Sequence, residues 1–350
     1  MKIVRYLIAL LALGAAMTSI PSVAATGAGT PYDKAERLSA FGERPAFSPD
    51  GSRVAFIGKS YGDAYEIDLA TGDVRNLTGA IPHQGFLRVH YLPSGDYLLL
   101  GPKRDIGPLK RIRVDLYVLD RHLRRGLQPL DQSVFEGVAI GPHNKIAWQQ
   151  IPDGSVLRKD ETWLQAVERN TLETYVGQIE YRDGKPRLTG KRRIMNRRPG
   201  NPAPDGCRGE VQDFRRNGNE LVHTCWGSDA AGRYVGIFGH DLATGAVTTF
   251  YKARGGEYAE VEGISPDGSW TTVECGQRKG TEFLLDLCRL ELTPNGKLSP
   301  LIIGSAPGST RHMGNPVISP NGKMIAFQSG DSAIGDIGEG DGIYLMRIAE

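Results

Sequence analysis

The sequence is poor in cysteine and has almost no excess charge. Four cysteines stand among its 350 residues, and no two of them are close enough for a Cys-x-x-Cys motif. A redox dithiol and a paired-cysteine zinc site are therefore excluded. Lys and Arg number 42 against 40 Asp and Glu. A chain so close to neutral gives no reason to expect nucleic-acid binding, which depends on a basic surface.

Apolar runs long enough to cross a membrane are missing after residue 25. At the N-terminus, Lys2 and Arg5 precede the apolar run 6–16, and small residues occupy 22–25. This layout is typical of a secretory signal peptide, whose apolar core is too short to span a bilayer. We predict that residues 1–25 are a signal peptide and that the mature chain is periplasmic or secreted, without a transmembrane segment. A retained N-terminal anchor is the alternative.

A tight turn recurs along the chain. Ser-Pro-Asp-Gly occupies 48–51 and 265–268, and Ser-Pro-Asn-Gly occupies 319–322, each between two apolar runs. Pro presets the first turn dihedral, Asp or Asn bonds its own backbone, and Gly supplies the positive φ, so each copy predicts a β-hairpin. Weaker copies near 93–95, 141–144 and 216–219 bring the count to six. A spacing of roughly 45 residues indicates a repeat protein.

Six such repeats predict an all-β fold, a six-bladed β-propeller of four-stranded antiparallel blades that forms one domain over 26–350. The last repeat stops after its third strand, at 342–348, and the segment 32–39 has the pattern of a fourth strand. We therefore expect the N-terminal strand to close the ring, which removes exposed sheet edges. Residues at about 151–171 are predicted to be an insertion, with a helix around 161–167. A seventh blade within 150–206 is the alternative.

These turns resemble the WD40-like repeats of TolB-type six-bladed β-propellers, and the resemblance covers nearly all of the mature chain. It implies a fold rather than an activity, because propellers include both binding modules and enzymes. The repeats, together with His312 before the last turn, are also similar to oligogalacturonate lyases, propellers with a His-rich metal site.

In propellers of this type, the strand before each turn is the innermost, so its polar side chains approach the central channel. In Glu260-Val261-Glu262 the alternation places both carboxylates on one face. An acidic, His-bearing lining can bind a divalent metal ion or polarise a proton; alternatively, it only solvates a wet channel. No catalytic residue can be named. The candidate ligand-binding residues are Arg44, Arg88, His90, Glu136, Glu210, Asp213, Glu260, Glu262, His312 and Asn315.

The four cysteines are placed as two structural pairs. Cys207 and Cys225 are symmetrical about the turn predicted at 216–219, and Cys275 and Cys288 about a loop near 279–280. Adjacent antiparallel strands bring Cα atoms to a separation that suits a disulfide, and export permits the bond. We predict the disulfides Cys207–Cys225 and Cys275–Cys288.

Two charged surface features have alternative interpretations. The Gly-rich loop 330–342 has oxygen ligands suited to Ca²⁺, although an exposed acidic loop is the alternative. Basic clusters at 103–113 and 185–198 either bind anionic glycan or lipid headgroups, or protect edge strands from pairing. The weak calcium candidates are Asp331, Asp336, Glu339 and Asp341.

Together these patterns favour an exported interaction module of the cell envelope that binds a protein or a glycan. The alternative is an enzyme, a metal-assisted polysaccharide lyase or hydrolase that acts at the propeller channel. The expected partners are an envelope protein or an anionic glycan and not nucleic acid, and the expected state is a monomer. A divalent metal ion is the one cofactor that the sequence suggests.

Overall fold

The computed structural model describes residues 30–105, 107–152, 158, 161–197, 208–279, 282–304, 311–331 and 342–348. Three sequence predictions concern residues outside these ranges. They are the signal peptide at 1–25, the partner Cys207 of the first cysteine pair, and the acidic loop 330–342, of whose four calcium candidates only Asp331 is described. These three stay predictions.

The described residues form 24 strands in five sheets. Three sheets have four strands each. The first contains, in order, β3 (Glu43–Phe47), β4 (Arg53–Ile57), β5 (Ala64–Asp68) and β6 (Val74–Asn76). The second contains β14 (Arg208–Arg215), β15 (Glu220–Asp229), β16 (Gly232–Asp241) and β17 (Val247–Ala253). The third contains β2 (Glu36–Ser39), β24 (Ile343–Arg347), β23 (Met324–Asp331) and β22 (Arg311–Ile318).

The other two sheets are larger. One contains β1 (Thr30–Pro31), β21 (Leu298–Ile303), β20 (Glu282–Glu291), β19 (Trp270–Lys279) and β18 (Glu257–Ile264). The other contains β13 (Lys185–Arg197), β12 (Leu172–Arg182), β11 (Lys145–Gln150), β10 (Gln128–Ile140), β9 (Val114–Leu119), β8 (Tyr97–Gly101) and β7 (Arg88–Tyr91). The first half of β10 pairs with β9 and its second half with β11, so β10 belongs to two successive groups of four strands.

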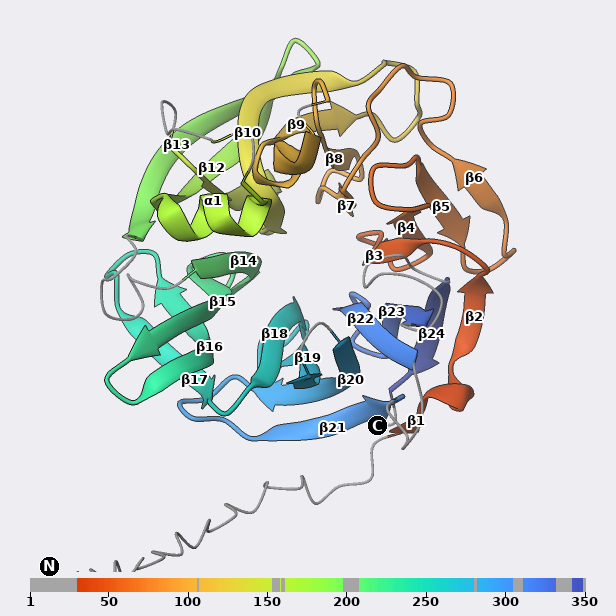
Figure 1. Cartoon of the computed structure of the whole chain (residues 1–350). Helices are drawn as coiled ribbons and strands as arrows, with labels where there is room; N and C mark the ends of the chain where they lie inside the picture. Colours follow the sequence, from red (N-terminus) through yellow and green to blue (C-terminus); the bar gives the residue numbers. More distant parts are fainter. Residues whose placement is uncertain are drawn as a thin grey trace, which may run out of the picture.

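The five sheets follow one another around a central opening (Figure 1). In each of the four smaller sheets, the strand nearest the centre is the one that precedes the repeated turn: β3, β14, β18 and β22. Apart from the short parallel pair of β1 and β21, the paired strands are antiparallel. The fold is therefore all-β, as the repeats predict.

The repeated turns have the same geometry at all three strong copies. In each, the Ser hydroxyl donates to the Asp or Asn side chain, at 2.6, 2.6 and 2.7 Å, and the Gly has a φ near 70°. The predicted hairpins are confirmed. Neighbouring turns also touch, because Gly51 lies against Pro320 and Gly322 against Pro266. The turns thus form a contact chain from one sheet to the next.

The two ends of the described chain share a sheet. Strand β2 pairs antiparallel with β24, with Arg37 opposite Tyr344. Before β2, the short helix η1 (Tyr32–Lys34) places the Tyr32 ring 5.1 Å from the Tyr344 ring and 6.4 Å from that of Phe327. Figure 1 shows this N-terminal strand beside β24.

The apolar core lies between neighbouring sheets rather than at the centre of the ring. One buried cluster joins Val54 and Phe56 of the first sheet to Ala326, Ile343 and Leu345 of the third. Other buried clusters join the other neighbouring sheets in the same way, and one further cluster fills the seven-stranded sheet itself. Because apolar side chains fill the spaces between sheets, the innermost strands are left to carry polar groups.

The predicted insertion contains a helix, α1 (Trp163–Arg169), between β11 and β12. It starts with a capping box, in which the Thr162 hydroxyl accepts from the Gln165 backbone while the Gln165 side chain accepts from the Thr162 N–H. Ala166 and Val167 pack against Ile112, which ends the short helix η2 (Gly107–Ile112). The insertion therefore positions η2, and η2 carries a residue of the central site.

Cys275 and Cys288 form a disulfide between β19 and β20, with their Cα atoms 5.8 Å apart, which confirms this predicted pair. Cys225 lies on β15, and its predicted pairing with Cys207 is outside the described residues. No helix among the described residues is long and apolar enough to span a membrane.

Candidate functional site

The innermost strands carry β-bulges at corresponding positions. In β3, Arg44 and Pro45 together face one residue of β4, and in β22, Asn315 and Pro316 do the same against β23. In β18 the bulge contains Glu262. Arg44 and Asn315 have φ values of 54° and 49°, in the left-handed region. A bulge re-aims a side chain, which is why bulges are common beside functional sites.

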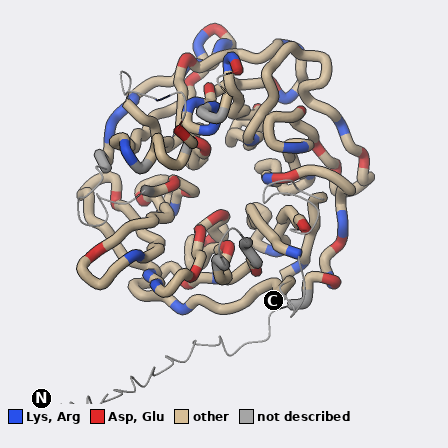
Figure 2. The backbone as a smooth tube through the Cα atoms, viewed as in Figure 1, with Lys and Arg blue, Asp and Glu red and all other residues tan. Residues whose placement is uncertain are grey.

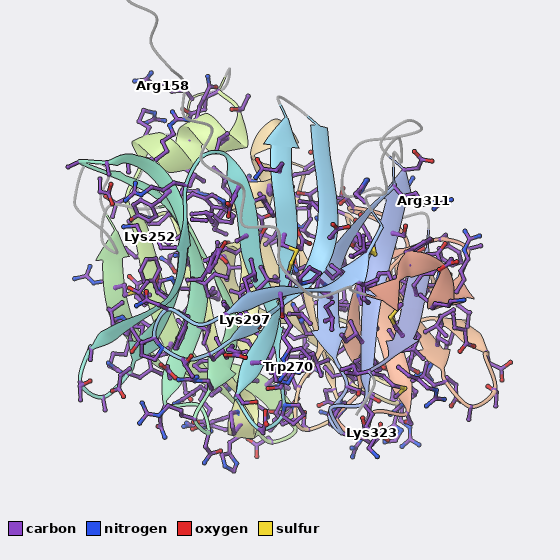
Figure 3. The ribbon with its side chains drawn as sticks, turned by 90° about the horizontal axis from the view of Figure 1, so that it is seen from below. Arg158, Lys252, Trp270, Lys297, Arg311 and Lys323 are labelled. Atoms are coloured by element: carbon purple, nitrogen blue, oxygen red, sulfur yellow. A yellow bond between two sulfur atoms is a disulfide. The ribbon has the colours of Figure 1, made fainter. Side chains whose placement is uncertain are left out.

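A cavity of about 420 Å³ occupies the centre of the molecule. It is lined by residues of β3, β7, β10, β14, β18 and β22, so every sheet contributes to it. Its lining also includes prolines of four repeated turns. In Figure 3, Trp270 and Lys323 follow two of the repeated turns and lie toward one face of the molecule, while Arg311 lies toward the other face. The cavity therefore extends toward the face of the turns. Its charged and amide side chains are Arg44, Arg88, His90, Gln212, Asp213, Glu262 and Asn315.

Three arginines from separate elements lie at the centre: Arg44 and Arg88 line the cavity, and Arg111 is close enough for their charges to act on it. Arg44 of β3 is 2.7 Å from Glu43, and Arg88 of β7 is 3.2 Å from Glu210. Arg111 of η2 pairs with Glu136 of the bulge in β10. Each guanidinium thus has one carboxylate partner.

The arginines keep unused donors. The Nε atoms of Arg44 and Arg88 are buried and have no hydrogen-bond partner among the described residues. Both side chains are about nine-tenths buried. Burial lowers the pKa of Arg44; burial also lowers that of Arg88, but the carboxylates of Glu210 and Glu262 outweigh it and raise the pKa. Both guanidinium groups are therefore cationic at neutral pH.

Three glutamates gather beside the cavity, and one of them, Glu262, is among its lining residues. One carboxylate oxygen from each of Glu260, Glu262 and Glu274 lies within 4.8 Å of the others. Glu260 and Glu274 are directly opposite each other on β18 and β19, and both are buried. Figure 2 shows acidic residues on these inner strands around the central opening.

The hydrogen bonds of the three glutamates differ. Glu274 Oε1 accepts from the backbone N–H of Asn315 at 2.6 Å, and Glu260 Oε1 accepts from the Gln212 amide at 3.2 Å. The Tyr258 hydroxyl also donates to Glu260. Glu262 accepts no hydrogen bond from the described residues, which leaves its carboxylate the most available of the three.

Burial and mutual repulsion disfavour ionisation of this cluster. Burial raises the pKa of Glu274 to about 7, and burial followed by the charges of neighbouring glutamates raises the pKa of Glu260 and of Glu262 well above the usual range. The three carboxyl groups have no arginine at hydrogen-bond distance among the described residues, because each arginine is paired elsewhere. Together with Asp213, which also lines the cavity, the described residues of the centre thus hold four carboxyl groups in excess of their three guanidinium groups.

Two further groups in the wall have shifted pKa values. Asp213 accepts backbone N–H groups from Phe214 at 2.7 Å and from Ile264 at 3.2 Å, and burial raises its pKa to about 7. Burial and the charge of Arg88 lower the pKa of His90 to about 3, so its imidazole is neutral. Asp213 therefore suits proton transfer near neutral pH, whereas neutral His90 suits hydrogen bonding.

Replacing Asp213 with Asn is expected to change how stability depends on pH. A carboxyl group whose pKa is higher in the folded state than its usual value near 4 stabilises the fold fully below pH 4, and this contribution is lost as the pH rises to about 7. Wild-type stability relative to Asp213→Asn should therefore fall by about 4 kcal/mol between pH 4 and pH 8, since raising a pKa from near 4 to about 7 corresponds to that free energy. Urea unfolding at several pH values measures this difference, and a pH-independent difference would contradict it.

The structure brings most of the sequence-predicted site residues together. Six of the ten line the cavity, and Glu136, Glu210 and Glu260 bond to groups around it. His312 is buried but is not among the lining residues; its ring lies against Gly330. Asp331 ends β23 and is half-buried.

Sequence reasoning missed Glu274, Arg111, Tyr258 and Gln212. The basic pattern at 103–113 predicts a surface position for Arg111, whereas Arg111 pairs with Glu136 at the centre. Glu274 lies on the strand that follows the repeated turn at 265–268. The prediction takes channel residues only from strands that precede a turn, so it does not include Glu274. The Gly at 263, which follows Glu262, was the available signal for a β-bulge. This bulge places Glu274 opposite Glu260.

Comparisons with known proteins identify the fold. No family model matches the chain, and no curated protein matches its sequence. Oligogalacturonate lyase from Vibrio parahaemolyticus is 14% identical, with a TM-score of 0.56 over 92% of this chain and 96% of the lyase. Regucalcin, a calcium-binding protein from Agrobacterium tumefaciens, is 13% identical, with a TM-score of 0.53 over 91% of this chain and 95% of its own.

The propeller domain of Swd1 from Myceliophteria thermophila is 14% identical, with a TM-score of 0.51 over 90% of this chain and 98% of that domain. All three are β-propeller proteins, so this chain has a β-propeller fold. At these identities the likeness shows the fold and nothing of the activity. Membership of the TolB-type family stays a prediction.

Proposed function

We propose that this chain is an exported binding module of the cell envelope, a six-bladed β-propeller of the TolB type whose ligand site is the central cavity. The six blades are β3–β6, β7 to the first half of β10, the second half of β10 to β13, β14–β17, β18–β21, and β22–β24 closed by β2. Intact-mass analysis of the exported protein tests two parts of this proposal. The chain should begin near residue 25, and its mass should lack the hydrogens of four thiols.

The observation that supports a binding site is the cost of the charges at the centre. Buried ionised groups destabilise a fold unless they are well paired, and pairs of this kind add little net stability. Arg44 and Arg88 nevertheless keep buried donors that no described residue uses. A guanidinium binds carboxylate, sulfate or phosphate oxygens through its planar N–H groups. The cavity therefore suits the anionic group of a glycan or of an envelope protein.

Direct binding measurements test this function. Acidic oligosaccharides and acidic peptides, with neutral counterparts as controls, are titrated into the protein in a calorimeter. Arg44→Lys keeps the charge but loses the planar fork, so the affinity for the anionic ligand should fall by about tenfold or more. Arg182→Lys, at the exposed end of β12, is the matched control and should leave the affinity unchanged. Failure of every acidic probe to bind would overturn the proposal.

A second function, metal-assisted lyase or hydrolase action on an acidic polysaccharide, is favoured by one observation. Glu274 and Asp213 have pKa values raised to about 7 beside arginines that suit a uronate carboxylate. Product analysis after incubation with acidic polysaccharides and divalent metal decides between the two. Turnover that Glu274→Gln abolishes supports the enzyme, and stable binding without turnover supports the module.

A further inference from the structure

The three-glutamate cluster combines close packing with excess negative charge. Glu260, Glu262 and Glu274 each place an oxygen within 4.8 Å of the others, and two of the three side chains are buried. Like charges at this distance repel strongly when water is excluded. Such a cluster is stable either with protons bound or with a cation between the carboxylates.

The arginines supply an independent observation that points to a ligand. Arg88 is close enough for its charge to interact with all three cluster glutamates, and Arg44 is close enough to interact with Glu262 and Glu274. Both arginines line the same cavity and keep a buried Nε donor without a partner among the described residues. A donor of this kind costs free energy until an acceptor reaches it. One cavity thus presents unused donors for an anion beside carboxylates that lack a cation.

From this juxtaposition we infer that Glu260, Glu262 and Glu274 hold a divalent cation, and that the anionic group of the ligand binds between this cation and Arg44 and Arg88. The inference rests on the proposed function, because it assigns the class of ligand to the same cavity. The ligand is an anion-bearing molecule that binds together with its metal ion.

The donor set selects the class of metal. All three donors are carboxylate oxygens, and no His or Cys belongs to the group among the described residues. Hard oxygen donors suit Ca²⁺, Mg²⁺ and Mn²⁺, whereas zinc and copper sites favour nitrogen and sulfur. Gln212 and Asn315, which line the cavity and donate to Glu260 and Glu274, fix the orientation of these two carboxylates.

Cation and anion should bind cooperatively. A bound divalent ion cancels most of the cluster's charge, which otherwise repels an incoming anion. By linkage, the anion then raises the affinity for the metal by the same factor. We expect each ligand to raise the affinity for the other by a factor of about ten, which is in the lower range of coupling free energies measured between two binding sites.

The test is a metal titration without any anion, on chelator-treated full-length protein. Mn²⁺ and Ca²⁺ should each bind at one saturable site by calorimetry. Glu262→Gln should weaken binding by at least about tenfold, which corresponds to about 1.4 kcal/mol. This variant is chosen because Glu262 accepts no hydrogen bond from the described residues, so the isosteric change leaves the surrounding contacts in place. Glu180→Gln, on an exposed part of β12, is the matched control and should bind like wild type.

A second measurement does not depend on the stability of a variant. The Trp226 ring lies 6.2 Å from the ring of Tyr258, whose hydroxyl donates to Glu260. Paramagnetic Mn²⁺ in the cluster should quench Trp226 fluorescence, and Ca²⁺ should compete and restore it. The variant Trp226→Phe should lose this quenching, which would assign the fluorescence change to Trp226. Quenching that is absent in wild type, or that Ca²⁺ does not reverse, would overturn the inference.

Sulfate as an anion probe separates the two proposals. With saturating Mn²⁺, sulfate should bind about tenfold more tightly than to the metal-free protein, and Arg44→Lys should remove this gain. If neither Mn²⁺ nor Ca²⁺ binds, or if Glu262→Gln and Glu260→Gln bind these metal ions like wild type, the proposal of a cation site is wrong. Acidic oligosaccharides that still bind metal-free protein would then leave the proposed function standing. If metal binds but sulfate affinity is independent of it, the shared site is wrong.

Discussion

Replacing Arg88 with Met is expected to lower the free energy of unfolding by about 3–5 kcal/mol. Arg88 bonds to Glu210 at 3.2 Å and to the Asn315 side chain at 3.2 Å, and its charge also acts on the three-glutamate cluster. A methionine fills a similar volume but leaves Glu210 as an unpaired buried carboxylate. Urea unfolding followed by circular dichroism measures the loss.

A double-mutant cycle separates the ion pair from the packing. Glu210→Gln in the Arg88→Met background removes the unpaired carboxylate, so part of the stability should return. We expect a coupling energy of about 1–3 kcal/mol between the two positions. The exposed pair of Arg182 and Glu180, whose charged atoms are 3.5 Å apart, is the control, and its coupling energy should be under about 0.5 kcal/mol. If Arg88→Met is as mild as Arg182→Met, then the centre tolerates free charge and the argument for a built site is wrong.

The parts of the fold that the sequence predicted depend on local chemistry. The Ser-Pro-Asp-Gly turns form wherever their residues occur, because side chain and backbone of the same few residues make the bonds. Cys275 and Cys288 were predictable as a pair for the same reason, since a short hairpin separates them. The polar residues of the innermost strands converge because each strand precedes such a turn.

The parts that could not be predicted depend on register and on packing at a distance. Counting back from the turn at 265–268 places Glu260 opposite Cys275, but the bulge shifts the register by one and places it opposite Glu274. Three carboxylates therefore meet where the turn alone indicates two. His312 likewise lies beyond the bulge at Asn315 and Pro316, so alternation from the turn no longer gives its face. Arg111 reaches the centre only because the insertion helix packs on η2.

Removing the N-terminal strand is the second change with a large expected effect. A chain that begins at Phe41 lacks Tyr32, which packs on Phe327 and Tyr344, and Leu38, which packs on the cluster of Ile343 and Leu345. Apolar side chains of this size contribute about 1.5–3 kcal/mol each when buried. The loss should be about 5 kcal/mol, and the Tm should fall by about 10 °C or more.

The comparison that isolates the segment 30–40 is with a chain that begins at Thr30, which keeps β1, η1 and β2. Without β2, the ladder groups of β24 face solvent, and an unpaired strand edge pairs readily with other chains. The shorter chain should therefore also form oligomers at micromolar concentration, seen by size-exclusion chromatography. A synthetic peptide of residues 30–40 should restore both the Tm and the monomer, because strand addition to an open edge uses the same backbone bonds. Equal Tm values for the two chains would show that the ring does not depend on its N-terminal strand.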